Sequence, residues 1–173
     1  MKYFYLKQKV FSLRNAYTIY DDQKTELYYA KSKFLVSRKL TLYESTTDNI
    51  LYTMERKRFS FRPSYTISDS NGTNVASTKK QRALFKQKVN VDSAHGQLVI
   101  EGNYRAHDFT IKHENGKDLA SIHKKRLAWG DTYEIVIYAD DHETFYLALV
   151  LLIDSKYHEK RKRSNTRRSR INR

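Results

Sequence analysis

Apolar and polar residues alternate along most of residues 3–139. The alternation is clearest where branched or aromatic side chains occupy every second position, as at Leu98 and Ile100 or at Tyr133 and Ile135. This pattern predicts half-buried β-strands, because successive side chains of a strand point to opposite faces of a sheet. Over this range the chain is therefore expected to be almost entirely β.

Two Asn-Gly pairs mark the turns of an internal repeat. Residues 65–77 align without gaps on residues 109–121, and the pairs at 71–72 and 115–116 coincide. Asn-Gly is the strongest short hairpin signal, because both residues tolerate a positive φ, and it predicts two-residue loops here. A weaker third copy covers residues 17–27, with Gln23-Lys24 at the turn, and residues 42–50 are a candidate fourth copy.

The repeat also predicts how its strands pair. With two-residue loops, four cross-strand pairs fall on the core face: Ile67 with Ala76, Tyr65 with Thr78, Ile111 with Ala120, and Phe109 with Ile122. An alanine at the same level of both hairpins leaves room for a thick element to pack against the sheet.

A helix is the expected thick element. It should begin near residues 140–142, where carboxylates complement a helix N-terminus, and end at about Tyr157. Residues 145–153 are apolar on every side, so the helix must be buried all round, which a closed barrel achieves. The alternative interpretation of this segment is a long central strand. The predicted fold is mainly β: a closed antiparallel β-barrel around a buried C-terminal hydrophobic α-helix.

Length and charge divide the chain of 173 residues into one domain, residues 1–157, and a basic tail, residues 158–173, expected to be disordered. From residue 155 onward, nine basic residues and one glutamate contribute +8 of the net charge of +14. The absence of cysteine fits a reducing compartment, so a cytoplasmic location is expected. The first ten residues alternate in polarity, unlike a signal peptide, and residues 145–153 are too short to span a membrane.

At this point the chain resembles the LURP-one-related family, within the tubby C-terminal-like group. The resemblance rests on the repeated units, on residues 122–125 (Ile-His-Lys-Lys), on residues 129–133 (Trp-Gly-Asp-Thr-Tyr), and on the apolar helix closed by Ile153-Asp154. It covers residues 1–157 and implies the same barrel around a central helix. Relatives in the group include phosphoinositide binders and phospholipid scramblases, so the resemblance implies phospholipid binding, but it transfers no individual ligand residue.

Catalytic and metal-binding motifs are absent from the sequence. The six histidines show no His-x-His or HExxH spacing, and no nucleophile elbow or phosphate-binding glycine loop occurs. The predicted register pairs His113 with Asp118 and His123 with Asp108 on the outer face, where such pairs are usually structural. We therefore expect no enzyme activity, no catalytic residue, no metal and no cofactor.

Basic clusters are the remaining candidates for a site. One follows each repeat hairpin, and a third lies at residues 56–58. The first two comprise Lys79, Lys80 and Arg82, and Lys124, Lys125 and Arg126. If they share one rim of the barrel they form a cationic patch suited to phosphate groups, although a solvated rim explains them more simply. The tail adds Lys160, Arg161, Lys162, Arg163, Arg167, Arg168 and Arg170.

These observations predict a non-enzymatic binding or scaffold protein with an anionic partner, and the resemblance favours lipid headgroups. The alternative is a nucleic-acid-associated protein whose tail binds RNA or DNA nonspecifically through counterion release. The tail lacks the aromatic residues that base stacking needs.

Overall fold

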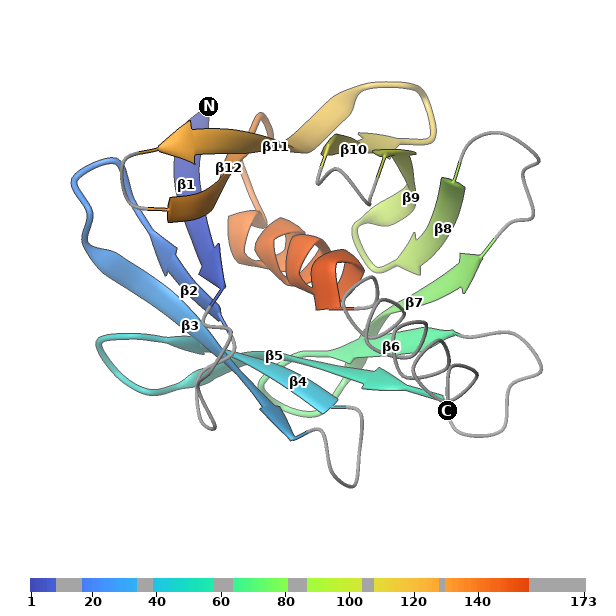
Figure 1. Ribbon diagram of the computed structural model, residues 1–173. Helices are drawn as coiled ribbons and strands as arrows, with labels where there is room; N and C mark the ends of the chain where they lie inside the picture. The colour runs from blue at the N-terminus through green and yellow to red at the C-terminus, as the bar shows by residue number, and fades with distance from the viewer. Residues whose placement is uncertain are drawn as a thin grey trace, which may run out of the picture.

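The computed structural model describes residues 1–8, 17–33, 39–57, 64–80, 87–103, 108–127 and 130–155 (Figure 1). Residues 143–155 are helical, and the predicted helix end and tail boundary near residue 157 lie outside the described residues. The strands are β1 (Lys2–Gln8), β2 (Tyr17–Tyr20), β3 (Glu26–Lys33), β4 (Lys39–Glu44), β5 (Ile50–Arg56), β6 (Tyr65–Ser68), β7 (Asn74–Lys80), β8 (Gln87–Ser93), β9 (Gly96–Asn103), β10 (Asp108–His113), β11 (Asp118–Leu127) and β12 (Gly130–Ile137).

Each strand pairs antiparallel with its neighbours in the sequence, and β12 returns to pair with β1. The closing contact aligns Phe4 with Ile135 and Leu6 with Tyr133. Closure leaves no free sheet edge among these twelve strands, which removes the usual template for edge-to-edge association. The predicted closed antiparallel barrel is confirmed.

The size of the barrel matches the helix inside it. Twelve strands about 4.8 Å apart and tilted by about 40° give a backbone radius of roughly 12 Å. Inward side chains occupy about half of this radius, and a helix with its side chains needs the remaining 5–6 Å or so. Figure 1 shows the helix, in orange and red, running through the ring of strands.

The helix is buried on all sides, as its sequence predicts. Every side chain from residue 145 to residue 153 is at most 3% exposed, and these residues share one core cluster with Ala76 and Ala120. Burial of each large aliphatic or aromatic side chain contributes about 1.5–3 kcal/mol, so this one element contributes much of the hydrophobic driving force. A long central strand, the alternative interpretation, is wrong.

The Asn-Gly turns differ from the prediction. The amide of Gly72 donates to the carbonyl of Asp69 (3.1 Å), and the amide of Asp69 donates to the carbonyl of Thr73 (3.0 Å). Gly72 has a φ of +81°, so the loop is a three-residue type I turn that ends in a left-handed residue. Gly116 repeats the geometry with a φ of +90°. The predicted two-residue loops are therefore wrong.

The predicted register is nevertheless confirmed, because a β-bulge compensates for the extra loop residue. The register shifts by one between Ile67 and Ser68 and again between Ile111 and Lys112. Beyond each bulge Ile67 pairs with Ala76, and Ile111 pairs with Ala120. The other two predicted pairs, those of Tyr65 and Phe109, are also present.

Two further hairpins, β2–β3 and β4–β5, use the same device. Each has a register shift at the corresponding place, and each has a residue of positive φ in its turn, Lys24 (+70°) and Asp48 (+57°). The bulges add Leu27, Leu51 and Val75 to the side chains packed against the core. The four copies therefore share the bulge and the turn residue of positive φ, but the β4–β5 loop, in which the Asp48 amide donates to the Glu44 carbonyl, is one residue longer than the other three. A bulge at a barrel rim increases the local twist that closure requires.

Candidate anion-binding site

The antiparallel order gives the barrel two different ends. At one end, which we call the hairpin end, the even-numbered strands finish in residues 21–25, 45–49, 69–73, 94–95 and 114–117, and β12 continues to the helix through residues 138–142. At the opposite end the odd-numbered strands finish. The helix starts at the hairpin end and is about 20 Å long, so its last described turn approaches the opposite end.

Charge separates these two ends. In the sequence, the six hairpin-end connections contain seven Asp or Glu residues and two Lys residues. The segments that join strands at the opposite end, residues 9–16, 34–38, 57–64, 81–86, 104–107 and 128–129, contain nine Lys or Arg residues and no Asp or Glu. We call this opposite end the basic end.

The two basic clusters singled out in the sequence both belong to the basic end. Lys79 and Lys80 are the last residues of β7, and Lys124, Lys125 and Arg126 lie in the last part of β11, opposite the first residues of β12. Lys124 is exposed. Both clusters therefore occupy one rim, although nothing in their placement alone distinguishes binding from solvation.

The two clusters do not form a single pocket. Strands β8, β9 and β10 lie between β7 and β11, so the clusters are about four strand spacings, roughly 19 Å, apart along the wall. Arg56 is the last residue of β5, two strands from β7, and the exposed Lys57 directly follows it. Positive charge is thus distributed around the rim. The remaining candidates lie outside the described residues: Arg82, Lys160, Arg161, Lys162, Arg163, Arg167, Arg168 and Arg170.

Side-chain contacts hold the helix at the hairpin end. Glu143, the first helical residue, forms an ion pair with Lys2 at the start of β1 and accepts a hydrogen bond from the Tyr28 hydroxyl (3.4 Å). Burial and the nearby Glu143 carboxylate raise the pKa of Tyr28 to about 12, so this hydroxyl remains a donor at any physiological pH. These contacts join the helix to the first and third strands.

Two histidines stack where the helix begins. The rings of His95, in the β8–β9 turn, and His142 lie 3.7 Å apart between centroids, and His95 also meets Phe145 edge-on at 4.8 Å. His142 has a φ of +55° and its carbonyl accepts hydrogen bonds from the amides of Phe145 and Tyr146. Burial, and then the neighbouring His142, lower the pKa of His95.

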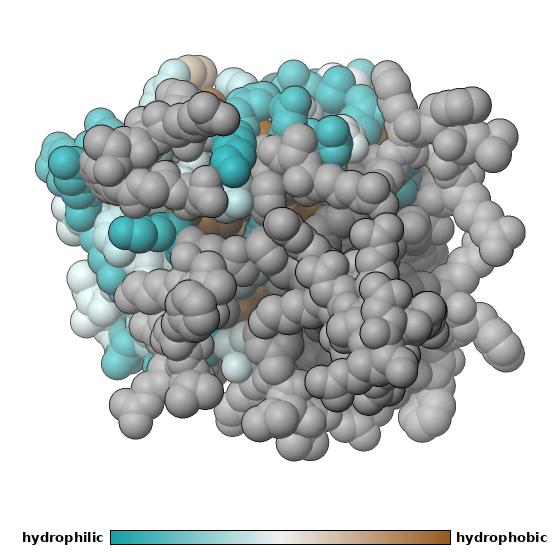
Figure 2. Space-filling model, in the orientation of Figure 1, coloured by the Kyte–Doolittle hydropathy of each residue, from teal (hydrophilic) through white to brown (hydrophobic). Residues whose placement is uncertain are grey.

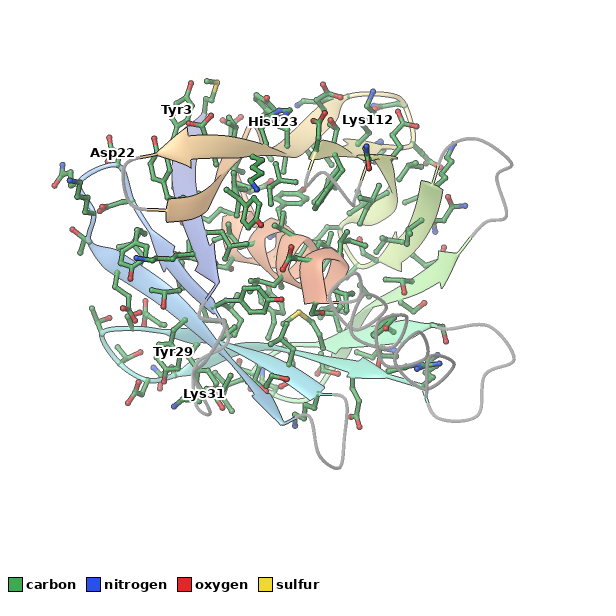
Figure 3. The ribbon with its side chains drawn as sticks, in the orientation of Figure 1. Tyr3, Asp22, Tyr29, Lys31, Lys112 and His123 are labelled. Carbon is green, nitrogen blue, oxygen red and sulfur yellow. The ribbon has the colours of Figure 1, made fainter. Side chains whose placement is uncertain are left out.

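Of the two predicted histidine–aspartate pairs, one is present in the structure and the other is not. His123 Nδ1 lies 2.9 Å from Asp108 Oδ1, as the register predicts, and His123 points away from the barrel axis (Figure 3). The His113–Asp118 pair is wrong, because the bulge moves Asp118 opposite Lys112 and the two form an ion pair at 3.6 Å. Within the described residues, no three His, Asp or Glu side chains are grouped as metal ligands.

The outer wall is mostly hydrophilic where it is described. Figure 2 shows this over β10–β11 at the top and β2–β3 at the left. Two lysines of this wall have local partners: Lys112 Nζ lies 3.3 Å from Glu101 Oε1, which raises the Lys112 pKa, and the Lys31 ammonium lies over the Tyr29 and Tyr43 rings (Figure 3). Among the described helical residues, no helix has the length and hydrophobicity to cross a bilayer.

The class of protein that these observations define is a closed antiparallel barrel threaded by its own C-terminal helix. Residues 2–154 match the model of the LURP-one-related family, and the chain belongs to that family. It is 26% identical over 151 residues to uncharacterized protein YxjI of Bacillus subtilis, covering 87% of this chain and 90% of that protein. A crystal structure of an Arabidopsis thaliana protein has the same fold, with a TM-score of 0.68 and 15% identity, covering 90% of this chain and 91% of the other.

The hairpin-end contacts were not predicted from the sequence. Lys2 and Glu143 are 141 residues apart, and nothing in their local pattern connects them. His95 and His142 gave a weak signal only, since each lies in a polar connection beside a strand or helix end. The charge separation becomes visible in the sequence only once the antiparallel strand order is known, because that order assigns alternate connections to opposite ends of the barrel.

Proposed function

We propose that this protein is a non-enzymatic, cytoplasmic anion-binding module whose basic end contacts anionic lipid headgroups. One observation carries the proposal: connections at the basic end contain nine Lys or Arg residues without a single Asp or Glu, whereas the hairpin end is acidic. Folding does not require this bias, because the hairpin end closes the same strands with acidic and neutral turns. Juxtamembrane basic residues contribute about 1 kcal/mol each toward an anionic leaflet.

The test compares two double variants of equal charge change. Lys79→Glu/Lys80→Glu alters the basic end, and Lys24→Glu/Lys117→Glu alters the hairpin end. Co-sedimentation with phosphatidylcholine vesicles that contain phosphatidylserine should show at least about a 30-fold loss of affinity for the first variant, since two lysines are worth about 2 kcal/mol. The second variant should bind like the wild type. Equal loss in both would mean that only net charge matters and would contradict the proposal.

The basic tail supports nucleic-acid association as a second candidate function. From residue 155 onward the sequence carries +8, and a chain with that many phosphate contacts should show a log–log salt slope of roughly 5 to 7 in magnitude. Truncation after Tyr157 separates the two functions. If the truncated barrel keeps its selectivity for anionic vesicles, lipid binding belongs to the basic end. If only the full-length chain binds, and binds poly-U RNA better than vesicles, the nucleic-acid function is favoured.

A further inference from the structure

The ends of the barrel are far enough apart to interact with a surface independently. A seven-residue strand such as β5 or β7 is about 23 Å long, whereas charges are screened over about 8 Å at physiological ionic strength. A partner at the basic end is therefore not repelled by the hairpin end. If the barrel lay on its side, the hairpin-end carboxylates would come within screening distance of the same surface.

The side wall between the ends offers little attraction to an anion. Lys112 is held between Glu101 (3.3 Å) and Asp118 (3.6 Å), and His123 is held by Asp108 (2.9 Å). Such exposed pairs have little net field beyond their own dimensions. Carboxylates also lie at the strand ends of the basic end, and they face basic residues or a histidine on the neighbouring strand: Asp108 begins β10 and is paired with His123, Glu55 faces Lys39, and Asp131 faces Arg126.

The spacing of the basic clusters indicates the shape of the partner. The clusters on β7 and β11 are roughly 19 Å apart, which excludes their sharing one phosphate group. An extended array of anions can contact both clusters at once, together with Arg56 at the end of β5 and Lys57 directly after it. The helix dipole opposes this contact with only about half a negative charge at the helix C-terminus, which the rim charges outweigh.

We infer that the protein docks end-on: an anionic bilayer surface contacts the basic-end termini of β5, β7 and β11, the barrel axis stands upright on it, and the acidic hairpin end projects into solution. This inference rests on the proposed function and adds the orientation and the contacting rim. It also leaves the hairpin end accessible while the protein is bound.

Two serines that flank β6 at its opposite ends provide matched positions for probes of this orientation. Ser64 precedes β6 at the basic end, and Ser70 follows it in the hairpin turn, six residues and about 20 Å away. Ser64→Cys and Ser70→Cys are near-isosteric and leave the net charge unchanged. The chain contains no cysteine, so each variant carries one thiol for a polarity-sensitive fluorophore.

The experiment measures acrylamide quenching of each labelled full-length variant, with and without phosphatidylserine-containing vesicles, while co-sedimentation measures binding of the same samples. End-on docking predicts a several-fold fall in quenching and a blue shift at residue 64, with neither at residue 70. If both labels are shielded equally, or residue 70 is shielded more, the orientation is wrong although binding stands. If neither labelled variant nor the unlabelled protein sediments with vesicles, the proposed function fails and the orientation fails with it.

Discussion

The hairpin end and the basic end close the same twelve strands with opposite chemistry. At the hairpin end, carboxylates form part of the turns: Asp69 accepts hydrogen bonds from the amides of Asn71 and Thr73, and Asp21 accepts one from Thr25. Glu143 fixes the start of the helix there. At the basic end the connections carry Lys and Arg without Asp or Glu. The hairpin-end carboxylates named above therefore have structural roles, and the two ends close the same strands with connections of opposite charge.

The largest expected effect comes from the helix that connects the two ends. Leu149 is fully buried at its middle, so Leu149→Asp should prevent folding, because a buried unpaired carboxylate costs several kcal/mol against a total stability of about 5–15 kcal/mol. Circular dichroism and size-exclusion chromatography should show an unfolded or aggregated chain. A cooperative, soluble variant with a native spectrum would contradict the view that both ends depend on one helix.

Two glycines differ in how tightly the backbone around them is packed, one at each end of the barrel. At the basic end, a Cβ on Gly102 would lie 2.5 Å from the Asp108 carbonyl oxygen, whereas a Cβ on Gly116 at the hairpin end meets nothing within 4 Å. Gly102→Ala should therefore cost about 3 kcal/mol through overpacking, and Gly116→Ala about 1 kcal/mol through positive-φ strain alone. Urea unfolding of both variants measures the difference, and equal losses would mean that the backbone at residue 102 yields readily.

Acid should weaken the hairpin end through the histidine stack. Because the pKa of His95 is lowered in the folded state, the unfolded chain takes up a proton more readily as the pH falls below about 6.5. The contribution of His95 to stability is therefore present above that pH and is lost as the pH falls through the folded pKa. The other titratable groups at this contact are His142 and Asp141, whose Oδ2 lies 3.5 Å from His142 Nε2.

Thermal melts between pH 7.5 and pH 5 measure this effect. Between pH 7.5 and pH 5 the melting temperature of the His95→Gln variant should fall by less than that of the wild type. His123→Gln, which removes an exposed histidine from the side wall, is the matched control for the His-to-Gln substitution itself. An unchanged pH profile in the His95 variant would show that the stack is not sensitive to protonation.

The smallest expected effect concerns the β2–β3 hairpin, whose turn contains no glycine. Lys24 lies at the turn position that Gly72 and Gly116 occupy in the two Asn-Gly hairpins, and its φ is +70°. Lys24→Gly should raise the stability by up to about 1 kcal/mol, because it relieves left-handed strain although it loosens the unfolded chain. Chemical denaturation gives the free-energy change, and Lys24→Ala, which keeps the strain, should show no gain.

Local chemistry in the sequence was sufficient for the strands, the helix and the register. Alternation at period two defines a strand wherever it occurs, and nine successive apolar residues require burial on every side. The turn type was missed because two different turns give the same register. A two-residue loop places Ile67 opposite Ala76, and so does a three-residue loop followed by a bulge. The sequence pattern therefore constrains loop length and bulge taken together, but neither of them separately.

Tertiary structure alone decided which charges lie together. The composition records a net charge of +14, but only the closed antiparallel order sorts alternate connections to opposite ends and brings Lys2 to Glu143 across 141 residues. The sequence also contained the two basic clusters, yet their separation by three intervening strands depends on the strand order. Such contacts lie beyond local prediction, because they depend on how strands far apart in the chain are arranged around one core.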